Sequence, residues 1–463
     1  MSTEKKVSNS RIGTQLFVGV LANLSILVAG TGFGWSSPSL PKIVNDENEF
    51  PVTPGQSSWI ASALVIGAVF GPIVSLIMVD RVGRKSTLLA TAFPNLICWI
   101  LIYFAQSYKW LMIGRLITGI GVGMTYTTIP LYVGEIAQVS VRGALGTIFN
   151  ICFNVGTLIC YSIGPFVTRQ TLALICMTFP ILFFISFFWM PETPYFYLMH
   201  KRGESAEKSL IWLRGNKDVK DELQEMADLV EIEQRNSGRL IDLVIVKGNR
   251  KATIIVLGIL SAQQFSGIGA IQAYGSIIFN QSDVQLNSDI VVIIMGIVTL
   301  VSSGITTLVV DRFGRKPLMI VSTFGCSLCL LFIAIYFHLK YCAVDVSVIL
   351  WLPVVTMILF FIFYSFGNGP LPYAILGEIY PTNVKAWATM LISIYGSITG
   401  AIVTKIYQVV ADGWGEHAIF YTFAVAEIIF LFFVIFVMFE TKGKSFREIQ
   451  EHLGETKLSN NKS

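Results

Sequence analysis

The chain has 463 residues, of which 54% are hydrophobic and 13% are charged, and its mean hydropathy is +0.66. Soluble domains carry about 25% charged residues, so this composition excludes an ordinary soluble domain and indicates a membrane protein. The net charge of +4 is small, and the positions of the charges are more informative than their sum.

Candidate membrane spans fill most of the sequence. A helix needs about 20 mostly apolar residues to cross a bilayer. Twelve segments meet this requirement, at residues 14–36, 57–79, 86–106, 110–133, 143–165, 171–190, 252–280, 289–310, 317–338, 347–377, 386–410 and 417–438. The first segment is too long for a removed signal peptide and lacks a small-residue cleavage site. We therefore predict an all-α membrane protein with twelve transmembrane helices.

The distribution of Lys and Arg predicts the orientation, because these residues gather on the cytoplasmic side of a membrane. With the N-terminus inside, most of the 33 basic residues fall in cytoplasmic segments. The exceptions are Lys42, Lys109, Arg115, Arg169, Lys340 and Lys405. We predict a multi-pass protein of the plasma membrane with both termini in the cytoplasm. The sequon that begins at Asn280 then faces outward, but it lies against a span, which disfavours glycosylation.

A long polar loop divides the chain into two halves of six spans each. The predicted parts are a cytoplasmic N-terminus (1–13), a first six-helix bundle (14–190), a linker (191–251), a second six-helix bundle (252–438) and a cytoplasmic tail (439–463). The linker has helical periodicity and balanced charge, which predicts short amphipathic helices on the cytoplasmic face. A disordered linker is the alternative.

Two nearly identical basic turns occur at matching positions of the two halves. They are Asp80-Arg-Val-Gly-Arg-Lys85 and Asp311-Arg-Phe-Gly-Arg-Lys316, and each lies directly between two spans. Glycine at the fourth position permits a tight turn. A basic turn that only sets orientation has no need to recur, so the repetition favours a duplicated transporter.

A second pair of charges repeats in the same order. Glu135 precedes Arg142 and Glu378 precedes Lys385, in each case at the predicted cytoplasmic ends of neighbouring spans. Such charges can hold the two halves together when the cytoplasmic side is closed and separate when it opens. The predicted latch consists of Asp80, Arg84, Glu135, Arg142, Asp311, Arg315, Glu378 and Lys385. The alternative is that these charges set topology alone.

The tenth span is interrupted by Gly367, Gly369, Pro370 and Pro372. Proline removes a backbone donor and kinks a helix, and membranes tolerate this where neighbours or a water-filled cavity satisfy the freed carbonyls. We predict a moving gate here, with a static kink as the alternative.

Other chemistry is not indicated. The seven cysteines lie in or at the ends of spans, the four histidines are scattered, and there is no phosphate-binding Walker loop. We expect no metal, no cofactor, no nucleic-acid partner and no enzymatic activity.

The motifs, taken in order, resemble those of sugar porters of the major facilitator superfamily over the whole chain. The matching segments are the two basic turns, Gly114-Arg115 with Gly119, Gly121 and Gly123, Leu131–Glu135 with Arg142-Gly143, Pro191–Pro194, Gln263–Ile268, Gly367–Pro372 and Glu440–Gly443. Trp35–Lys42 resembles the insect facilitated trehalose transporters within this family. The resemblance implies two pseudo-symmetric six-helix bundles, a sugar site between them and alternating access.

The resemblance also implies the residues of the sugar site. They are Gln263 and Gln264, Asn150, Tyr274, Thr299 and Tyr373. Glutamine amides suit sugar hydroxyls because they both donate and accept hydrogen bonds, although helix-to-helix hydrogen bonding would also explain them. Tyr373 replaces the family's usual tryptophan and keeps an aromatic face for the sugar ring.

Several positions depart from the family pattern towards smaller side chains. They are Gly269, Thr299, Ser365, Gly396 and Ser397. The site is therefore expected to be roomier, which is compatible with a disaccharide, with another polyol or with weak binding.

The position that carries a proton-binding aspartate in proton-coupled relatives is Ser36 here. We therefore expect a uniporter for trehalose or a hexose such as glucose that functions as a monomer in the lipid bilayer. Glu427 in the twelfth span pairs with Lys405 or has another structural role, or it is a proton site, which leaves a proton-coupled symporter as the alternative. A non-transporting sugar receptor is disfavoured because little sequence follows Phe439 to serve as a signalling tail.

Overall fold

The computed structural model describes residues 12–45, 50–235, 238–282, 287–442, 444, 448–449 and 453–454. Within these ranges every regular element is a helix, and twelve helical segments are long and apolar enough to cross a membrane. This confirms the predicted all-α membrane fold.

The first half contains six spans. Its helices are α1 (Ile12–Gly34), α2 (Ser36–Asn45), α3 (Pro54–Ala68), α4 (Gly71–Val82), α5 (Arg84–Ala90), α6 (Ala92–Tyr103), α7 (Tyr108–Ile136), α8 (Val139–Ile163), the 3₁₀ turn η1 (Gly164–Phe166) and α9 (Arg169–Phe188). The linker that follows contains α10 (Pro194–Met199), α11 (Gly203–Arg214), α12 (Lys220–Arg235) and α13 (Asp242–Ile245).

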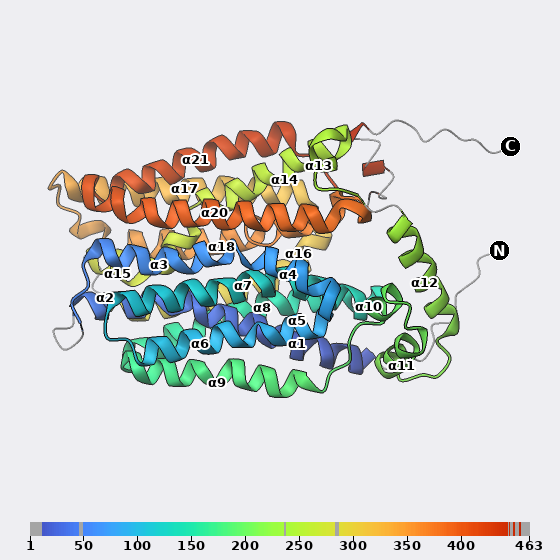
Figure 1. Ribbon diagram of the computed structural model, residues 1–463. Coiled ribbons are helices and arrows are strands. Elements are labelled where there is room, and N and C mark those ends of the chain that lie inside the picture. The colour runs from blue at the N-terminus through green and yellow to red at the C-terminus, as the bar shows by residue number, and fades with distance from the viewer. Residues whose placement is uncertain are drawn as a thin grey trace.

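The second half also contains six spans. Its helices are α14 (Lys247–Phe265), α15 (Ile268–Gln281), α16 (Ser288–Phe313), α17 (Arg315–Tyr341), the 3₁₀ turn η2 (Ser347–Ile349), α18 (Leu352–Phe366), α19 (Leu371–Ile379), α20 (Thr382–Trp414) and α21 (Glu416–Val437). In Figure 1 the blue and green helices of the first half lie below the orange and red helices of the second, and α10 to α12 lie at one end. We call this end the linker end and the opposite end the far end.

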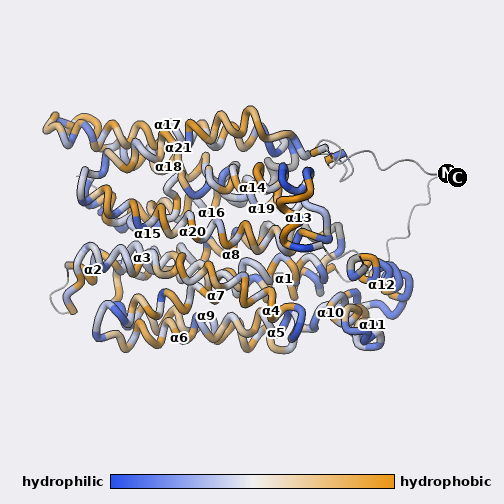
Figure 2. Tube along the Cα trace, turned by 45° about the horizontal axis from the view of Figure 1, so that its top comes forward, coloured by the Kyte–Doolittle hydropathy of each residue, from blue (hydrophilic) through white to orange (hydrophobic). Residues whose placement is uncertain are grey.

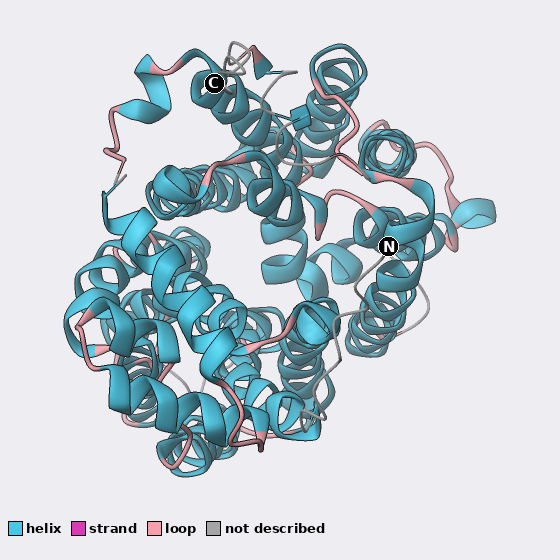
Figure 3. Ribbon diagram, turned by 90° about the vertical axis from the view of Figure 1, so that its right-hand side faces the viewer, coloured by secondary structure: helices cyan, strands magenta, loops and turns pink. Residues whose placement is uncertain are grey.

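The helix axes run roughly parallel, as a membrane bundle requires. Seen from the linker end, most long helices are viewed nearly end-on (Figure 3). Hydrophobic residues predominate along these helices, whereas α12 is largely hydrophilic (Figure 2).

Several spans are divided into consecutive helices, and the breaks in the seventh and tenth spans lie beside the polar interior of the second half. The tenth span ends as α18 and resumes as α19, which confirms the interruption predicted from its Gly and Pro residues. The seventh span lies where it was predicted, at 252–280, and the structure adds a break within it. This break lies between α14 and α15, where Gly267 has a left-handed φ of 78° and Ser266 donates its hydroxyl to Gln263 O at 2.7 Å.

The apolar core is shared at the far end and divided at the linker end. One continuous far-end cluster contains residues of both halves, among them Trp35, Trp99, Tyr274 and Phe420. Towards the linker end, one cluster is built from the first half with α11, and another from the second half with α13. The halves are therefore packed against each other at the far end and packed separately at the linker end.

Candidate functional site

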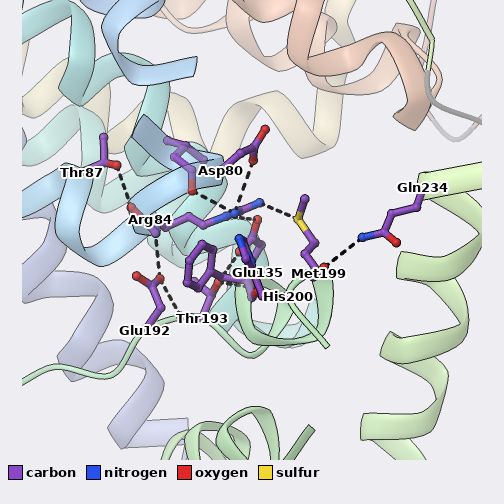
Figure 4. A network of polar contacts seen from close by, with 12 residues as sticks. Asp80, Arg84, Thr87, Glu135, Glu192, Thr193, Met199, His200 and Gln234 are labelled. Carbon is purple, nitrogen blue, oxygen red and sulfur yellow. Dashed lines mark hydrogen bonds and ion pairs between the residues drawn. The ribbon is translucent and has the colours of Figure 1, made fainter. Parts of the chain in front are cut away.

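At the linker end of the first half, a network of charged groups surrounds Arg84 (Figure 4). The Arg84 side chain is only 5% exposed, and its Nε donates to Glu135 Oε1 at 3.0 Å. Thr193 donates its hydroxyl to the same carboxylate. The carboxylate of Glu192 accepts from the backbone N–H of Arg84 at 3.1 Å and of Lys85 at 3.0 Å.

The second half contains the same network in the same arrangement. Arg315 Nη2 lies 3.0 Å from Glu378 Oε1, and Thr441 donates to Glu378 Oε2 at 2.6 Å. Glu440 accepts from the backbone N–H groups of Arg315 and Lys316, each at 3.0 Å. The duplication read from the basic turns therefore extends to the segment that follows each half.

The glycine of each basic turn is required by this network. Gly83 and Gly314 have φ values of 103° and 92°, a region that disfavours residues with a Cβ. A Cβ at Gly83 would also collide with the carboxylate of Glu192, and one at Gly314 with that of Glu440. The turns are thus shaped around the carboxylates that accept their N–H groups.

The ion pairs described here join helices within one half, not one half to the other. Asp80 is an exposed partner of Arg84, with 3.5 Å between Nη1 and Oδ1, and Lys385 donates to Gly377 O at 2.6 Å. The side chains of Arg142 and Asp311 lie outside the described residues. Since the halves are packed separately at this end, a clasp between them remains a prediction for a state in which the linker end is closed.

The two networks differ in their expected response to acid. Burial raises the pKa of Glu192 above its ordinary value of 4.5, although backbone N–H donors and Arg84 oppose this. Burial also acts to raise the pKa of Glu440, but the backbone N–H groups of Arg315, Lys442, Lys316 and Thr441 together hold it below 4.5.

These pKa shifts predict opposite stability effects. A carboxyl whose folded-state pKa is depressed stabilises the fold above its unfolded-state pKa, and the contribution is lost as the pH falls through the folded-state pKa. Glu440→Gln should therefore lower the melting temperature of the purified protein at neutral pH and have less effect in acid. Because burial raises the pKa of Glu192, its ionised form stabilises the fold less, so Glu192→Gln should cost less at neutral pH than Glu440→Gln. Melting curves at several pH values check this, and equal losses at all pH values would contradict it.

In the interior of the second half, a cluster of amides surrounds the break in the tenth span. Gln263 is 5% exposed, and its Nε2 donates to the backbone carbonyls of Asn368 and Gly369, each at 2.8 Å. Gln264 is less buried, and its Nε2 donates to Gln263 Oε1 at 3.3 Å. Gln263 thus uses its donors on the break, while Gln264 keeps a hydrogen and its carbonyl oxygen for other partners.

Of the alternatives considered for Glu427, the pairing with Lys405 is wrong. Glu427 is fully buried and accepts from Asn368 Nδ2 at 3.2 and 3.3 Å. Lys405 lies at the far end, where it donates to Ser58 Oγ at 2.5 Å and sits 4.3 Å from the centre of the Trp59 ring. The two residues share neither depth nor surroundings, because α20 carries Lys405 towards its far end.

Sequence reasoning missed Asn368. Its only signal was its place between Gly367 and Gly369 in the interrupted span. A small polar residue flanked by glycines at a helix break is one whose backbone and side chain both need partners, and this could have indicated its role.

A second set of polar residues lies between the halves. Asn154 Nδ2 on α8 donates to Ser303 Oγ on α16 at 3.0 Å, which joins the first half to the second. Asn150 and Thr299 each lie four residues from one member of this pair, and therefore on the same helix face. Both are partly buried, so the structure places these two predicted residues on surfaces that face the opposite half.

Aromatic residues complete this surface. Tyr373 is 41% exposed, and its ring centre lies 6.5 Å from that of Tyr126 on α7 of the other half. Tyr126, which sequence reasoning missed, also contacts Phe149 edge-on at 5.3 Å. Tyr274 is instead fully buried in the far-end core, where its ring stacks on that of Tyr407 with 5.1 Å between the ring centres. Its side chain is therefore not exposed on the surface between the halves in this arrangement.

Buried Arg115 on α7 lies beside Ser36 on α2. Arg115 Nη2 donates to Ser36 Oγ at 2.6 Å, Nη1 donates to Gly32 O, and the guanidinium lies 5.3 Å from the centre of the Trp35 ring. The groups that hold this cation are thus neutral oxygen atoms and an aromatic face.

Two six-helix halves, duplicated turns and a polar surface between the halves define a membrane transporter of the major facilitator fold. The model of the "Sugar (and other) transporter" family matches residues 28–453, so the chain belongs to this family of transporters and is not an enzyme. It is therefore a multi-pass membrane protein.

Similar proteins share most of the chain. It is 34% identical to the facilitated trehalose transporter Tret1 of Polypedilum vanderplanki, over 96% of this chain and 88% of the relative. It is 33% identical to Tret1 of Drosophila mojavensis over 96% of this chain, which spans about half (52%) of that longer relative. The proton:xylose symporter XylE bound to 6-bromo-6-deoxy-D-glucose has the same fold, with a TM-score of 0.77, 20% identity, and coverage of 95% of this chain and 99% of that one.

Proposed function

We propose that this protein is a facilitative sugar transporter, a uniporter that moves trehalose or a hexose such as glucose across the plasma membrane. In this proposal the linker end is cytoplasmic, the protein functions as a monomer in the bilayer, and its parts are those predicted from the sequence. The observation that carries the proposal is the polar and aromatic surface between the halves, in a chain of the sugar transporter family. The likeness to Tret1 supports trehalose as a substrate.

The sugar site is proposed to lie against the break in the tenth span. Gln264 offers an amide hydrogen and a carbonyl oxygen to sugar hydroxyls. Tyr373 and Tyr126 offer aromatic faces to the apolar side of a sugar ring from opposite halves. Asn150 and Thr299 are proposed to add polar contacts, while Gln263 supports the break and Tyr274 closes the far end.

Alternating access is proposed to occur by rocking of the two halves about this site. The shared core at the far end and the separate cores at the linker end describe one of the two states this motion needs. Closing the linker end would bring the two charged networks together as a latch, with Gly367, Gly369, Pro370 and Pro372 as the gate of the tenth span.

Uniport is proposed because a hydroxyl group faces Arg115. Ser36 does not titrate in the working pH range, so it cannot bind and release a proton during transport. Glu427 is the competing proton site, since a buried intramembrane carboxylate is a functional candidate, and XylE is a proton-coupled protein of the same fold.

Sugar uptake should therefore be driven by the sugar gradient alone. Labelled trehalose and glucose uptake into oocytes, measured at acidic and neutral outside pH, should equilibrate without accumulation. Concentrative uptake that an uncoupler abolishes, and that Glu427→Gln also abolishes, would overturn uniport and make Glu427 the coupling site.

A further inference from the structure

The break in the tenth span is fixed on one side by a single residue. Asn368 is fully buried, and each of its four polar groups has a partner. Its backbone N–H donates to Ser322 Oγ at 2.9 Å, and its backbone carbonyl accepts from Gln263. Its side-chain Oδ1 accepts from Thr323 at 3.2 Å, and its Nδ2 donates to Glu427.

These partners come from three other helices. Ser322 and Thr323 lie on α17, Gln263 on α14 and Glu427 on α21. Asn368 is the donor to Glu427 among the described residues, and removing one partner of a buried hydrogen bond leaves the other partner unsatisfied, which costs more than removing an exposed one. The backbone before Pro370 is therefore held at a point where three helices of the second half converge.

On the other side of the break, no side-chain hydrogen bond reaches the described residues Pro370 to Tyr373, and Leu371 is held by apolar packing instead. Pro370 and Pro372 have no N–H to donate, and α19 begins directly after Pro370. Tyr373, two residues into α19, is 41% exposed and faces the opposite half. The structure thus combines a segment fixed by side-chain hydrogen bonds and a segment held by apolar packing, on the two sides of the Gly369–Pro370 bond.

We propose that Asn368 and Glu427 form the fixed pivot of the tenth span and position the Gln263–Gln264 amides at the sugar site. This inference rests on the proposed function, in which the tenth span is a gate. Asn368 and Glu427 act through Gln263 and do not touch the sugar, so they are positioning residues. As part of this pivot, Glu427 has a structural role that needs no proton transfer.

The test exchanges donor and acceptor across the pair. Asn368→Asp keeps the shape of the side chain but places two carboxyl groups against each other, whereas Glu427→Gln keeps an acceptor for Asn368. The double variant restores a donor–acceptor pair with the roles reversed, since the amide introduced at position 427 can donate to the carboxylate introduced at position 368. We expect Asn368→Asp to raise KM and to reduce kcat/KM for sugar uptake roughly tenfold or more. Glu427→Gln and the double variant should stay within about threefold of the wild type.

A matched control removes another buried hydrogen bond of the same half. Tyr380 donates to Thr253 Oγ1 at 3.0 Å, away from the break, so Thr253→Val should leave KM unchanged. Two results would overturn the proposed pivot: wild-type kinetics in Asn368→Asp, or a defect of Asn368→Asp that remains in the double variant with Glu427→Gln.

Failure of the proposed function is distinguishable from failure of the proposed pivot. If the wild type moves neither trehalose nor glucose, the function is wrong, and the same three variants are compared by melting temperature. Loss of stability in Asn368→Asp with recovery in the double variant would then support the pair, and absence of recovery would overturn it.

Discussion

Replacing Gln264 by alanine is expected to reduce sugar uptake at least tenfold while leaving the amount of protein at the cell surface near normal. Each hydrogen bond to substrate contributes about 0.5–1.5 kcal/mol net, and more where a buried partner is left unsatisfied. Gln264 can supply two such bonds, because only one of its amide hydrogens is used by Gln263. The carbonyl oxygen of Gln264 lies beside Gly400 on α20, where a Cβ would approach it to 2.8 Å.

The measurement is uptake of labelled trehalose and glucose over a range of concentrations, normalised to surface expression. Gln408→Ala is the control, because Gln408 makes an exposed hydrogen bond to Asp412 elsewhere in the same half. Kinetics that match the wild type in Gln264→Ala would show that the sugar site is not on the seventh span.

Reversing the charge of Arg84 is expected to be the most damaging change at the linker end. The side chain is 5% exposed and pairs with Glu135, so Arg84→Glu leaves buried carboxylates without their cation. Breaking a buried pair in this way costs about 3–5 kcal/mol. We expect a lower melting temperature, a resting state shifted towards an open linker end, and reduced exchange from outside.

Arg81→Glu is the matched control, since it makes the same charge change at an exposed position of the same turn. Labelling of introduced cysteines from the cytoplasm reports how often the linker end is open. If both variants insert correctly and label like the wild type, the basic turns set topology alone and the latch hypothesis is wrong.

The features that sequence reasoning predicted correctly are local ones. Apolar length is sufficient to identify a span, and the Gly and Pro residues of the tenth span indicate its break. The break at Gly267 was missed because one glycine in a continuous apolar segment is compatible with an unbroken helix. Glu192 and Glu440 were recognised within motifs. Their acceptance of N–H groups from the basic turns could not be predicted, because it depends on how the segment after each half packs against the turn of that half.

Contacts between distant spans were harder to predict. Asn368 and Glu427 are in contact because they lie at the same depth in the membrane and on the sides of their spans that face each other. Hydropathy predicts neither the depth nor the side. Lys405 was chosen as the partner of Glu427 on estimated depth alone, and it lies instead beside Ser58. Tyr126 gave no signal, because its role arises only when the halves face each other. The latch and the sugar ligands remain predictions.

In each half, the segment that follows the last helix is bound to the basic turn of the same half. Glu192 follows the last helix of the first half and binds the turn between α4 and α5, and Glu440 does the same for α16 and α17. The first of these contacts also uses the linker helices before Arg235, since Ser209 on α11 donates to Glu192 O and Arg84 donates to Met199 Sδ on α10. A chain cut between Arg235 and Gly238 would thus give two polypeptides with complete closures, able to reassemble through the far-end core. In this respect the two halves resemble two separate subunits that are joined by a linker.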